Sequence, residues 1–464
     1  MCPAPCADTL PFRGFSLRLF FPGCVFLVNA GLSFFHGVIM KLLHTSDWHL
    51  GAALYDAPRY GEHKAFLGWL TDLIASEHID ALLVAGDIFD KVMPPNEAAG
   101  LYYSFLAGLG SAGCRQAVIT GGNHDSPSRL NAPGDVLKGI GVRVIGCMPE
   151  KVEEEVIPLK DRNGRTAALV CAVPYLRDRD VRVCREGDDP EDRESAIAKG
   201  VAAHYAAVRE TARKMDPKLP LIAMGHLFAG GAAARDGESP ILVGTLGKIP
   251  TENFTGGFAY VALGHIHSPQ KLKVAGKVME NVRYCGSPLP MSFDETAGKE
   301  VVILDIGEDG SCGVQPVPVP RFRELKRLSG GTEELRGILR KDVWEHPGMW
   351  LDIRCAEGTS RSLRENLDRV IAEEAEKRGV SPKDRPVILH TEAIPSDLPE
   401  DLGGRENDLA SLTPDEVFEK LLDSRGVREE ERGPLRGYYQ KVLRDLEEHP
   451  EGAPEGRQGT ETEN

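Results

Sequence analysis

The amino-terminal part of the chain carries short clusters of histidine, aspartate and asparagine, residue types that bind divalent metals and transfer protons. The clusters read DWH at 47–49, GDIFD at 86–90, GNHD at 122–125, GH at 225–226 and GHIH at 264–267. Carboxylate, imidazole and amide groups make a mixed nitrogen and oxygen site, which suits manganese, iron or zinc better than calcium. When one carboxylate bridges two ions, the pair activates a water and binds a phosphorus centre. The clusters therefore predict a two-metal phosphoester hydrolase.

Each cluster follows a short apolar run that predicts a β-strand. These runs alternate with amphipathic segments, which predicts a parallel sheet with helices on both faces. The carboxyl ends of such strands form a common crevice, so residues that follow them converge. The predicted strands include 41–46, 81–85, 116–120, 167–173, 219–224, 260–263 and 301–306, with helices at 62–77 and 96–109. The candidate metal ligands at the strand ends are Asp47, His49, Asp87, Asn123, His226, His265 and His267.

Each cluster taken alone also has a structural explanation. An aspartate after a strand is more often a helix cap than a metal ligand, and a single histidine such as His226 is more often a structural polar residue. The paired histidines of 264–267 and the glycine-backed 122–125 are more specific. Because all five clusters follow predicted strands in order, a metal site explains them better than five separate structural roles do.

Length and composition place the chain among multidomain globular proteins. Its 464 residues predict two or three domains. A formal net charge of -15 argues against binding nucleic acid by bulk electrostatics, so metals or a partner would have to supply positive charge. The ten cysteines lack zinc-site spacing, which predicts reduced thiols of a cytoplasmic protein.

Residues 1–39 differ from the rest of the chain. Arg13 and Arg18 precede an apolar run at 19–35, a pattern that fits a signal peptide or a marginal membrane anchor. The favoured interpretation is a start assigned upstream of the true one, because Met40 opens directly into the first predicted strand. None of these interpretations gives the extension a part in the chemistry.

The pattern changes in the carboxyl-terminal part. Strands at 321–328, 350–354 and 386–391 with helices near 332–340 and 361–378 predict a small α+β domain. The resulting domain boundaries are 1–39 for the extension, 40–295 for the catalytic domain, 296–395 for the capping domain, 396–411 for a linker, 412–449 for two helices and 450–464 for a disordered tail.

The two carboxyl-terminal helices have their own signals. Thr413, Pro414 and Glu416 form a capping box with proline at the first helical position. The second helix carries an apolar stripe of Leu435, Tyr438, Tyr439, Val442, Leu443 and Leu446. The pattern alone fits packing within this chain and packing against another chain equally well.

The order DxH, GDxxD, GNHD, GH and GHxH resembles the calcineurin-like metallophosphoesterase superfamily. Longer stretches resemble the nuclease-subunit family of bacterial SbcCD complexes, namely LLHTSDWHLG at 42–51, VAGDIFD at 84–90, VPYLRDRD at 173–180, YVALGHIH at 260–267 and YCGSPLPMSFDE at 284–295. The resemblance is specific from Met40 to about residue 295 and weaker to about residue 445. It implies an α/β calcineurin-like sandwich with an α+β capping domain and partner-binding helices at the carboxyl end.

The resemblance also implies residue roles. One ion would be held by Asp47, His49 and His267, the other by Asn123, His226 and His265, with Asp87 bridging. His124 would act on the scissile phosphate and Asp125 would orient it. Asp90 stands where archaeal and eukaryotic relatives often carry a histidine. Any role of that histidine in choosing between DNA strands is therefore not implied here.

The implied partner is the ATPase subunit SbcC, in a complex with two copies of each subunit and a homodimer of nuclease subunits. The implied activity is a manganese-dependent, ATP-dependent 3′→5′ double-strand exonuclease and single-strand or hairpin endonuclease on DNA. It would serve DNA repair, recombination and replication in the cytoplasm. Two alternatives stay open: a phosphatase or cyclic-nucleotide phosphodiesterase on the same fold, and a non-catalytic scaffold, which would be free to lose ligands.

Overall fold

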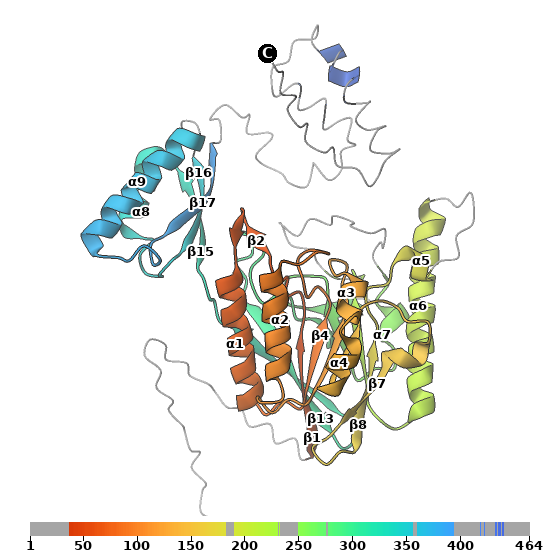
Figure 1. Ribbon diagram of the computed structural model, residues 1–464. Helices are drawn as coiled ribbons and strands as arrows, with labels where there is room; N and C mark the ends of the chain where they lie inside the picture. Colours follow the sequence, from red (N-terminus) through yellow and green to blue (C-terminus); the bar gives the residue numbers. More distant parts are fainter. Residues whose placement is uncertain are drawn as a thin grey trace, which may run out of the picture. The chain divides into compact units, whose positions relative to one another are not determined.

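The computed structural model describes residues 37–181, 190–230, 232, 249–274, 277–355, 360–393 and a few positions between 418 and 439 (Figure 1). The chain divides into two compact units. The first comprises Met1–Ala52, His63–Pro290 and Ala297–Pro320, and the second comprises Ala53–Glu62, Met291–Thr296 and Arg321–Asn464.

The first unit is built on two six-stranded sheets that pack face to face. The first sheet has the order β14-β13-β1-β4-β5-β6, in which β1, β4, β5 and β6 are parallel and β13 and β14 are antiparallel additions. Its strands are β1 (Val38–Thr45), β4 (Ala81–Ala85), β5 (Gln116–Thr120), β6 (Val142–Ile145), β13 (Lys299–Gly307) and β14 (Cys312–Val319). The fully apolar, fully buried β4 is typical of a parallel strand covered on both faces.

The second sheet has the order β11-β12-β10-β9-β8-β7, in which β8, β9, β10 and β12 are parallel. Its strands are β7 (Val156–Lys160), β8 (Thr166–Ala172), β9 (Leu221–His226), β10 (Tyr260–Gly264), β11 (Gln270–Val274) and β12 (Lys277–Tyr284). Side chains of both sheets meet in one core that includes Leu42, Leu83, Val170, Met224 and Tyr260. This core fixes the ends of the parallel strands of both sheets at one edge of the sandwich.

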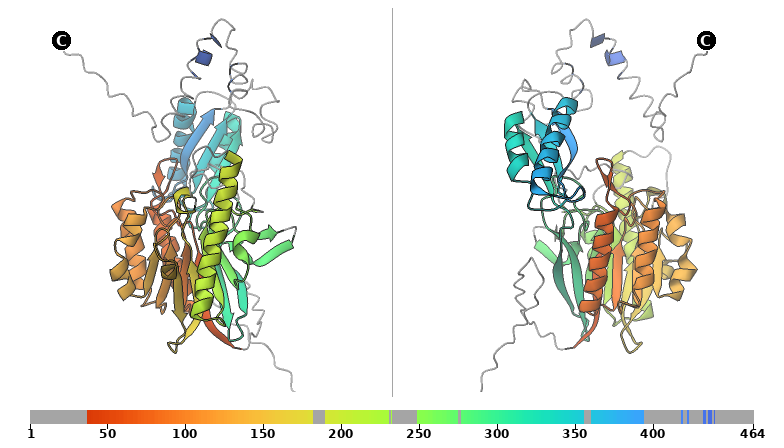
Figure 2. Two further views of the ribbon diagram at one scale, coloured as in Figure 1. Left: turned by 90° about the vertical axis from the view of Figure 1, so that its right-hand side faces the viewer. Right: turned by 60° about the vertical axis from the view of Figure 1, so that its left-hand side comes forward.

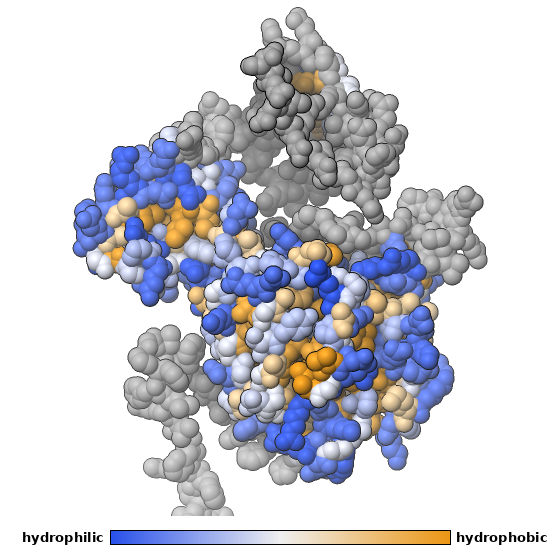
Figure 3. Space-filling model, in the orientation of Figure 1, coloured by the Kyte–Doolittle hydropathy of each residue, from blue (hydrophilic) through white to orange (hydrophobic). Residues whose placement is uncertain are grey.

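Helices cover the outer faces of the sandwich (Figures 1 and 2). Against the first sheet lie α1 (Tyr60–Ser76), α2 (Asn96–Gly108), α3 (Pro127–Asn131) and α4 (Gly134–Gly139). Against the second sheet lies α6 (Pro190–Met215), which buries Ile197, Val201 and Tyr205 in a second core. The remaining short elements of this unit are α5 (Asp178–Val181), α7 (Glu252–Thr255) and the 3₁₀ turn η1 (Val152–Glu155). Polar and apolar residues are interspersed on the face shown in Figure 3, as on most globular surfaces.

The second unit is a three-stranded parallel sheet of β15 (Leu325–Gly330), β16 (Trp350–Cys355) and β17 (Val387–Ala393). Helices α8 (Thr332–Lys341) and α9 (Ser360–Arg378) bury its core on one face. Leu54 and Phe293 pack on Trp350 in a smaller cluster. Leu54 belongs to a short hairpin of β2 (Ala53–Leu54) and β3 (Ala57–Pro58), so the unit is assembled from three separate stretches of chain.

The predicted α/β fold is confirmed, and two predicted boundaries are corrected. Residues 299–319 were expected in the capping domain, but they form β13 and β14 because β13 pairs with β1 along its length. The first strand begins at Val38, which pairs with Gly307, so the extension is shorter than 1–39.

Several predicted segments lie outside the described residues. These are residues 1–36, the linker at 396–411, the tail at 450–464 and most of the helices at 412–449. Among the few described positions, the rings of Phe418 and Tyr439 stack with centroids 4.0 Å apart. In the part of the chain that the structure describes, no helix is long and apolar enough to span a membrane.

Candidate metal centre

Polar side chains gather at the edge where the parallel strands of both sheets end. Four clusters lie in or next to the loops after β1, β4, β5 and β10, the fifth forms the end of β9, and all seven predicted ligands lie in the first unit. Two groups of these residues place their ligand atoms within 4.8 Å of one another, namely Asp47 with His49 and His267, and Asp47 with Asp87 and His226. The predicted convergence of the strand ends is therefore present in the structure.

The backbone of these loops is strained where the ligands lie. Asp47, His49, Asp87 and His265 have φ angles of 51°, 44°, 49° and 99°, a region that non-glycine residues rarely occupy. Such conformations cost about 1–3 kcal/mol each and persist where the surrounding structure fixes them, often at functional sites. The fixing contacts include backbone bonds from Asp47 to Gly86 and from His49 to Asp87, each 3.0 Å.

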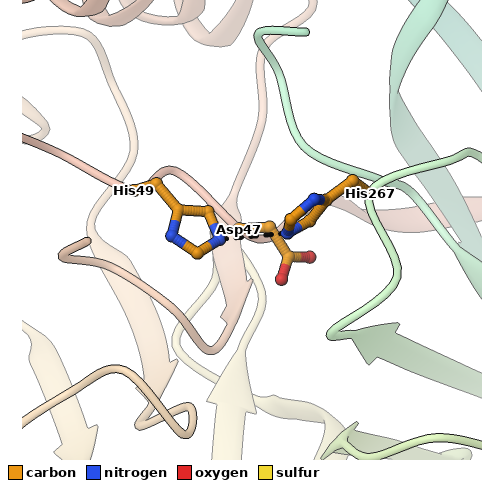
Figure 4. A group of neighbouring side chains, drawn as sticks. All are labelled: Asp47, His49 and His267. Carbon is orange, nitrogen blue, oxygen red and sulfur yellow. Dashed lines mark hydrogen bonds between the residues drawn. The ribbon is translucent and has the colours of Figure 1, made fainter. Parts of the chain in front are cut away.

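The first ligand group contains a direct contact between two imidazoles. Nε2 of His49 lies 3.2 Å from Nε2 of His267, with Asp47 beside them (Figure 4). Two imidazole nitrogens at this distance need a proton or a cation between them. The donor set of two imidazoles and a carboxylate therefore fits a divalent metal.

A second ligand group, here called the Asn123 group, consists of Asn123, His226 and His265. Oδ1 of Asn123 is 3.0 Å from Nε2 of His226 and 3.1 Å from Nδ1 of His265. Nδ1 of His226 donates to the Ala85 carbonyl at 2.9 Å, which leaves Nε2 to face the site. A backbone carbonyl that fixes the tautomer in this way is the usual support of a metal-binding histidine.

The Asp87 carboxylate lies between the two groups. Its Oδ2 atom is 3.2 Å from Nε2 of His226 and 3.7 Å from Nε2 of His49. A side chain in place of Gly122 would put its Cβ 2.1 Å from Oδ1 of Asp87. Only glycine therefore leaves room for the carboxylate. One carboxylate oxygen therefore faces an imidazole of each group.

Burial and charge set the protonation of the metal-free centre. Burial opposes ionisation of Asp87, but the His226 charge outweighs it and holds the pKa of this carboxyl well below its usual range. Burial likewise disfavours charged His226, yet the Asp87 carboxylate raises the pKa of this imidazole to about 9. Burial, aided by the charge of His226, lowers the pKa of His265 to about 4. Burial also raises the pKa of Asp47 to about 6.

His124 lies beside the first ligand group and is held through its backbone and one ring nitrogen. Its backbone N–H donates to Oδ1 of Asp87 at 2.9 Å, and its Nδ1 donates to the Asp90 carbonyl at 2.8 Å. The ring stands edge-on to His49 with centroids 5.0 Å apart. Nε2 is therefore the ring atom left to meet a substrate.

Asp125, which is expected to orient His124, bonds to the backbone of the loops around that residue. The buried Asp125 carboxylate accepts hydrogen bonds from three backbone N–H groups, those of Gly122 at 2.9 Å, Ile88 at 3.1 Å and Phe89 at 3.0 Å. It ties the GNHD loop to the loop after β4, while the Asp90 carbonyl orients His124. Sequence patterns do not reveal these hydrogen bonds, because they depend on which backbone groups the two loops bring together.

Two further residues support the ligands without being among those predicted to bind metal. Ser46 donates a hydrogen bond to Oδ2 of Asp47 and contacts Sγ of Cys285 at 3.1 Å. The carboxylate of Asp90 lies 3.6 Å from Nδ1 of His49, opposite the metal-facing nitrogen. The only sequence signal for Ser46 as a supporting residue is that it directly precedes the predicted ligand Asp47.

Comparisons with known proteins agree with this geometry. The family model of calcineurin-like phosphoesterases matches residues 40–269, which include all five clusters. The SbcD nuclease subunit of Escherichia coli strain K12 is 33% identical over 413 residues, covering 88% of this chain and 98% of that protein. The chain belongs to the SbcD family of nuclease subunits.

A second relative and one solved structure were also compared with this chain. The SbcD protein of Rhodobacter capsulatus is 40% identical over 309 residues, 65% of this chain and 74% of that protein. Among solved structures, the protein TT1561 of Thermus thermophilus has a TM-score of 0.34 at 14% identity and covers 61% of this chain and all of that one. This membership confirms the family predicted from the sequence motifs. The chain is therefore a metal-dependent phosphodiester hydrolase.

Proposed function

We propose that the chain is the nuclease subunit of a DNA-processing complex and that it hydrolyses phosphodiester bonds with two manganese ions. The observation that carries this proposal is the Asp87 carboxylate, which faces one imidazole of each ligand group with a single oxygen. That arrangement allows two ions to be held close together, as phosphodiester hydrolysis by displacement requires.

The two groups support the following ligand roles. Asp47, His49 and His267 would hold the first ion, Asn123, His226 and His265 the second, and Asp87 both. When bound, such ions polarise the phosphate and lower the pKa of a coordinated water. The mixture of imidazole, carboxylate and amide oxygen is compatible with manganese, as it is with iron or zinc.

His124 would provide general acid or electrostatic help at the phosphate. Its Nδ1–H donates to the Asp90 carbonyl, so Nε2 is the ring atom available to the substrate, and it carries a proton to give only in the imidazolium form. From this position it would stabilise charge on a phosphate oxygen or protonate the leaving oxygen.

We further propose that the chain works with the ATPase SbcC in the cytoplasm. The E. coli relative is named as a subunit of the SbcCD nuclease. The net charge of -15 supports a partner that supplies much of the DNA-binding surface. In this proposal two copies of each subunit assemble, residues 412–449 contact SbcC, and the second unit acts as the capping domain.

The activity is tested on full-length protein with manganese, using hairpin DNA, duplex DNA and bis(p-nitrophenyl) phosphate. We expect 3′→5′ degradation of duplex DNA and opening of hairpins when SbcC and ATP are present, and slower cleavage of single-stranded DNA without them. Faster turnover of the small diester than of any DNA would instead favour a phosphatase or phosphodiesterase. Asp87→Asn serves as the inactive control.

The partner contact is tested by truncation after about residue 405. Loss of SbcC co-purification with retained manganese-dependent cleavage of single-stranded DNA is the expected result. The stacking of Tyr439 on Phe418 indicates that part of the predicted stripe packs within the segment. Tyr438→Ala should therefore weaken the SbcC contact directly, while Tyr439→Ala should act by loosening the helix pair. Unchanged SbcC affinity of the truncated protein would place the contact elsewhere.

A further inference from the structure

A buried lysine lies behind the ligand His267. Lys299, at the start of β13, is only 7% exposed. Its Nζ atom donates to the main-chain carbonyl of His267 at 2.9 Å and to Oγ of Ser287 at 2.9 Å. Burying an ammonium group costs several kcal/mol unless it is well bonded. These charge-assisted bonds to the ligand loop therefore compensate a substantial cost.

The same carbonyl receives a second donor from the GSP segment. The N–H of Ser287 donates to the His267 carbonyl at 3.0 Å. Gly286 precedes it with φ +79°, and a Cβ there would lie 2.5 Å from that carbonyl oxygen. Only glycine lets the two stretches of backbone approach this closely. The glycine and serine of the YCGSPLPMSFDE stretch thus support the loop after β10.

The other end of His267 is its metal-facing nitrogen. Nε2 lies 3.2 Å from Nε2 of His49, and the ring belongs to a loop residue just beyond the end of β10. The direction of this ring depends on the position of its own main chain. The two donors on the carbonyl fix that position.

We propose that Lys299 is a positioning residue for the first of the two ions. It holds the His267 carbonyl so that the imidazole meets His49 and Asp47, and these two bonds support the loop of His267 and not the Asn123 group. This inference rests on the proposed two-ion centre. Residues that support a metal ligand typically change metal affinity by about 10–100-fold when removed.

The test measures manganese binding to the full chain by calorimetry and by the magnetic coupling of the two ions in electron paramagnetic resonance. Lys299→Met should lower the affinity for one ion by about tenfold or more and leave the affinity for the other within about twofold. The coupled signal should decrease as well. In a His267→Ala background the same change should have no further effect on that ion, because the two residues act as one unit.

Arg283→Met provides a matched control. Arg283 is also buried, 6% exposed, and its guanidinium pairs with Glu300 at 2.8 Å on the neighbouring residue of β13. This variant should lose stability without a change in the affinity of either ion. Equal metal affinities for Lys299→Met and Arg283→Met would overturn the proposal, as would weakening of both ions alike.

Ser287→Ala is the milder variant if Lys299→Met does not fold. It removes one acceptor of the ammonium group and keeps the backbone N–H, so the first ion should weaken several-fold. Wild-type affinity for both ions in Ser287→Ala would then count against the role of Lys299. If the unaltered protein binds no second manganese ion, the two-ion centre itself fails. If it binds two and both variants match it, only the Lys299 inference fails.

Discussion

The carboxylate of Asp87 and the imidazole of His226 lie 3.2 Å apart with both side chains almost fully buried. In the metal-free protein they form an ion pair, because the carboxylate raises the pKa of His226 to about 9 against the effect of burial. Metal binding must displace the proton of this pair, since a ligand imidazole is neutral.

Changing Asp87 to Asn tests the bridging role. The amide has nearly the same shape but cannot supply an anionic oxygen to both groups, so we expect loss of at least one ion and of hydrolysis with the fold retained. Elemental analysis, circular dichroism and a phosphodiesterase assay measure the three properties. Wild-type metal content together with wild-type activity would remove the bridging assignment.

Changing His124 to Gln separates chemistry from metal binding. We expect both ions to stay bound and the rate to fall by about 10²–10⁴, the usual contribution of a positioned acid. Single-turnover cleavage and metal content are measured on the same sample, with the exposed His346→Gln as a control. Loss of an ion in His124→Gln would make this residue a ligand.

Asp125 should act on stability, unlike His124. Asp125→Ala leaves three buried backbone N–H groups without an acceptor, and each such group costs about 1–3 kcal/mol. Urea unfolding in the presence of a chelator should show the loss without any metal contribution. A variant with unchanged stability and a large rate defect would favour a direct role of Asp125 in orienting His124 instead.

His44 gives a prediction for pH. It is completely buried, with Nδ1 3.1 Å from the Tyr260 hydroxyl, and burial together with the charge of Arg283 lowers its pKa to about 3. In the unfolded chain this imidazole has an ordinary pKa near 6.5 and is protonated below that pH, whereas in the folded protein it stays neutral. Its stabilising contribution is therefore complete above about pH 6.5 and is lost by about 1.4 kcal/mol per unit as the pH falls toward 3.

A His44→Phe variant isolates this effect from other buried histidines. Urea unfolding of both proteins with chelator at pH 7, 6 and 5 should give a shallower pH dependence for the variant. The difference in slope should approach about 1.4 kcal/mol per pH unit below pH 6. Parallel curves would show that His44 does not contribute to the acid sensitivity.

The sequence predicted the parts of the molecule that rest on local pattern. Strand β4 and the ligands after it were found because an unbroken apolar run ended in GDIFD. Helix α6 was not predicted, although Ile197, Val201 and Tyr205 have helical spacing. The contact of Lys299 with His267 was beyond prediction, since it joins residues 32 positions apart through two loops. The same holds for the Asp90 carbonyl that orients His124.

The three-stretch construction of the second unit has a consequence for protein synthesis. The hairpin at 53–62 leaves the ribosome first, and its packing partners Phe293 and Trp350 are translated more than two hundred residues later. Leu54 therefore lacks these packing partners while the first unit is synthesised. Folds with many contacts between residues distant in sequence share this property. An expression fragment that stops near residue 320 would leave Leu54 and Phe293 without Trp350 in every molecule. Such a fragment should need solubilising substitutions at these two positions, whereas a fragment that extends through β17 should not.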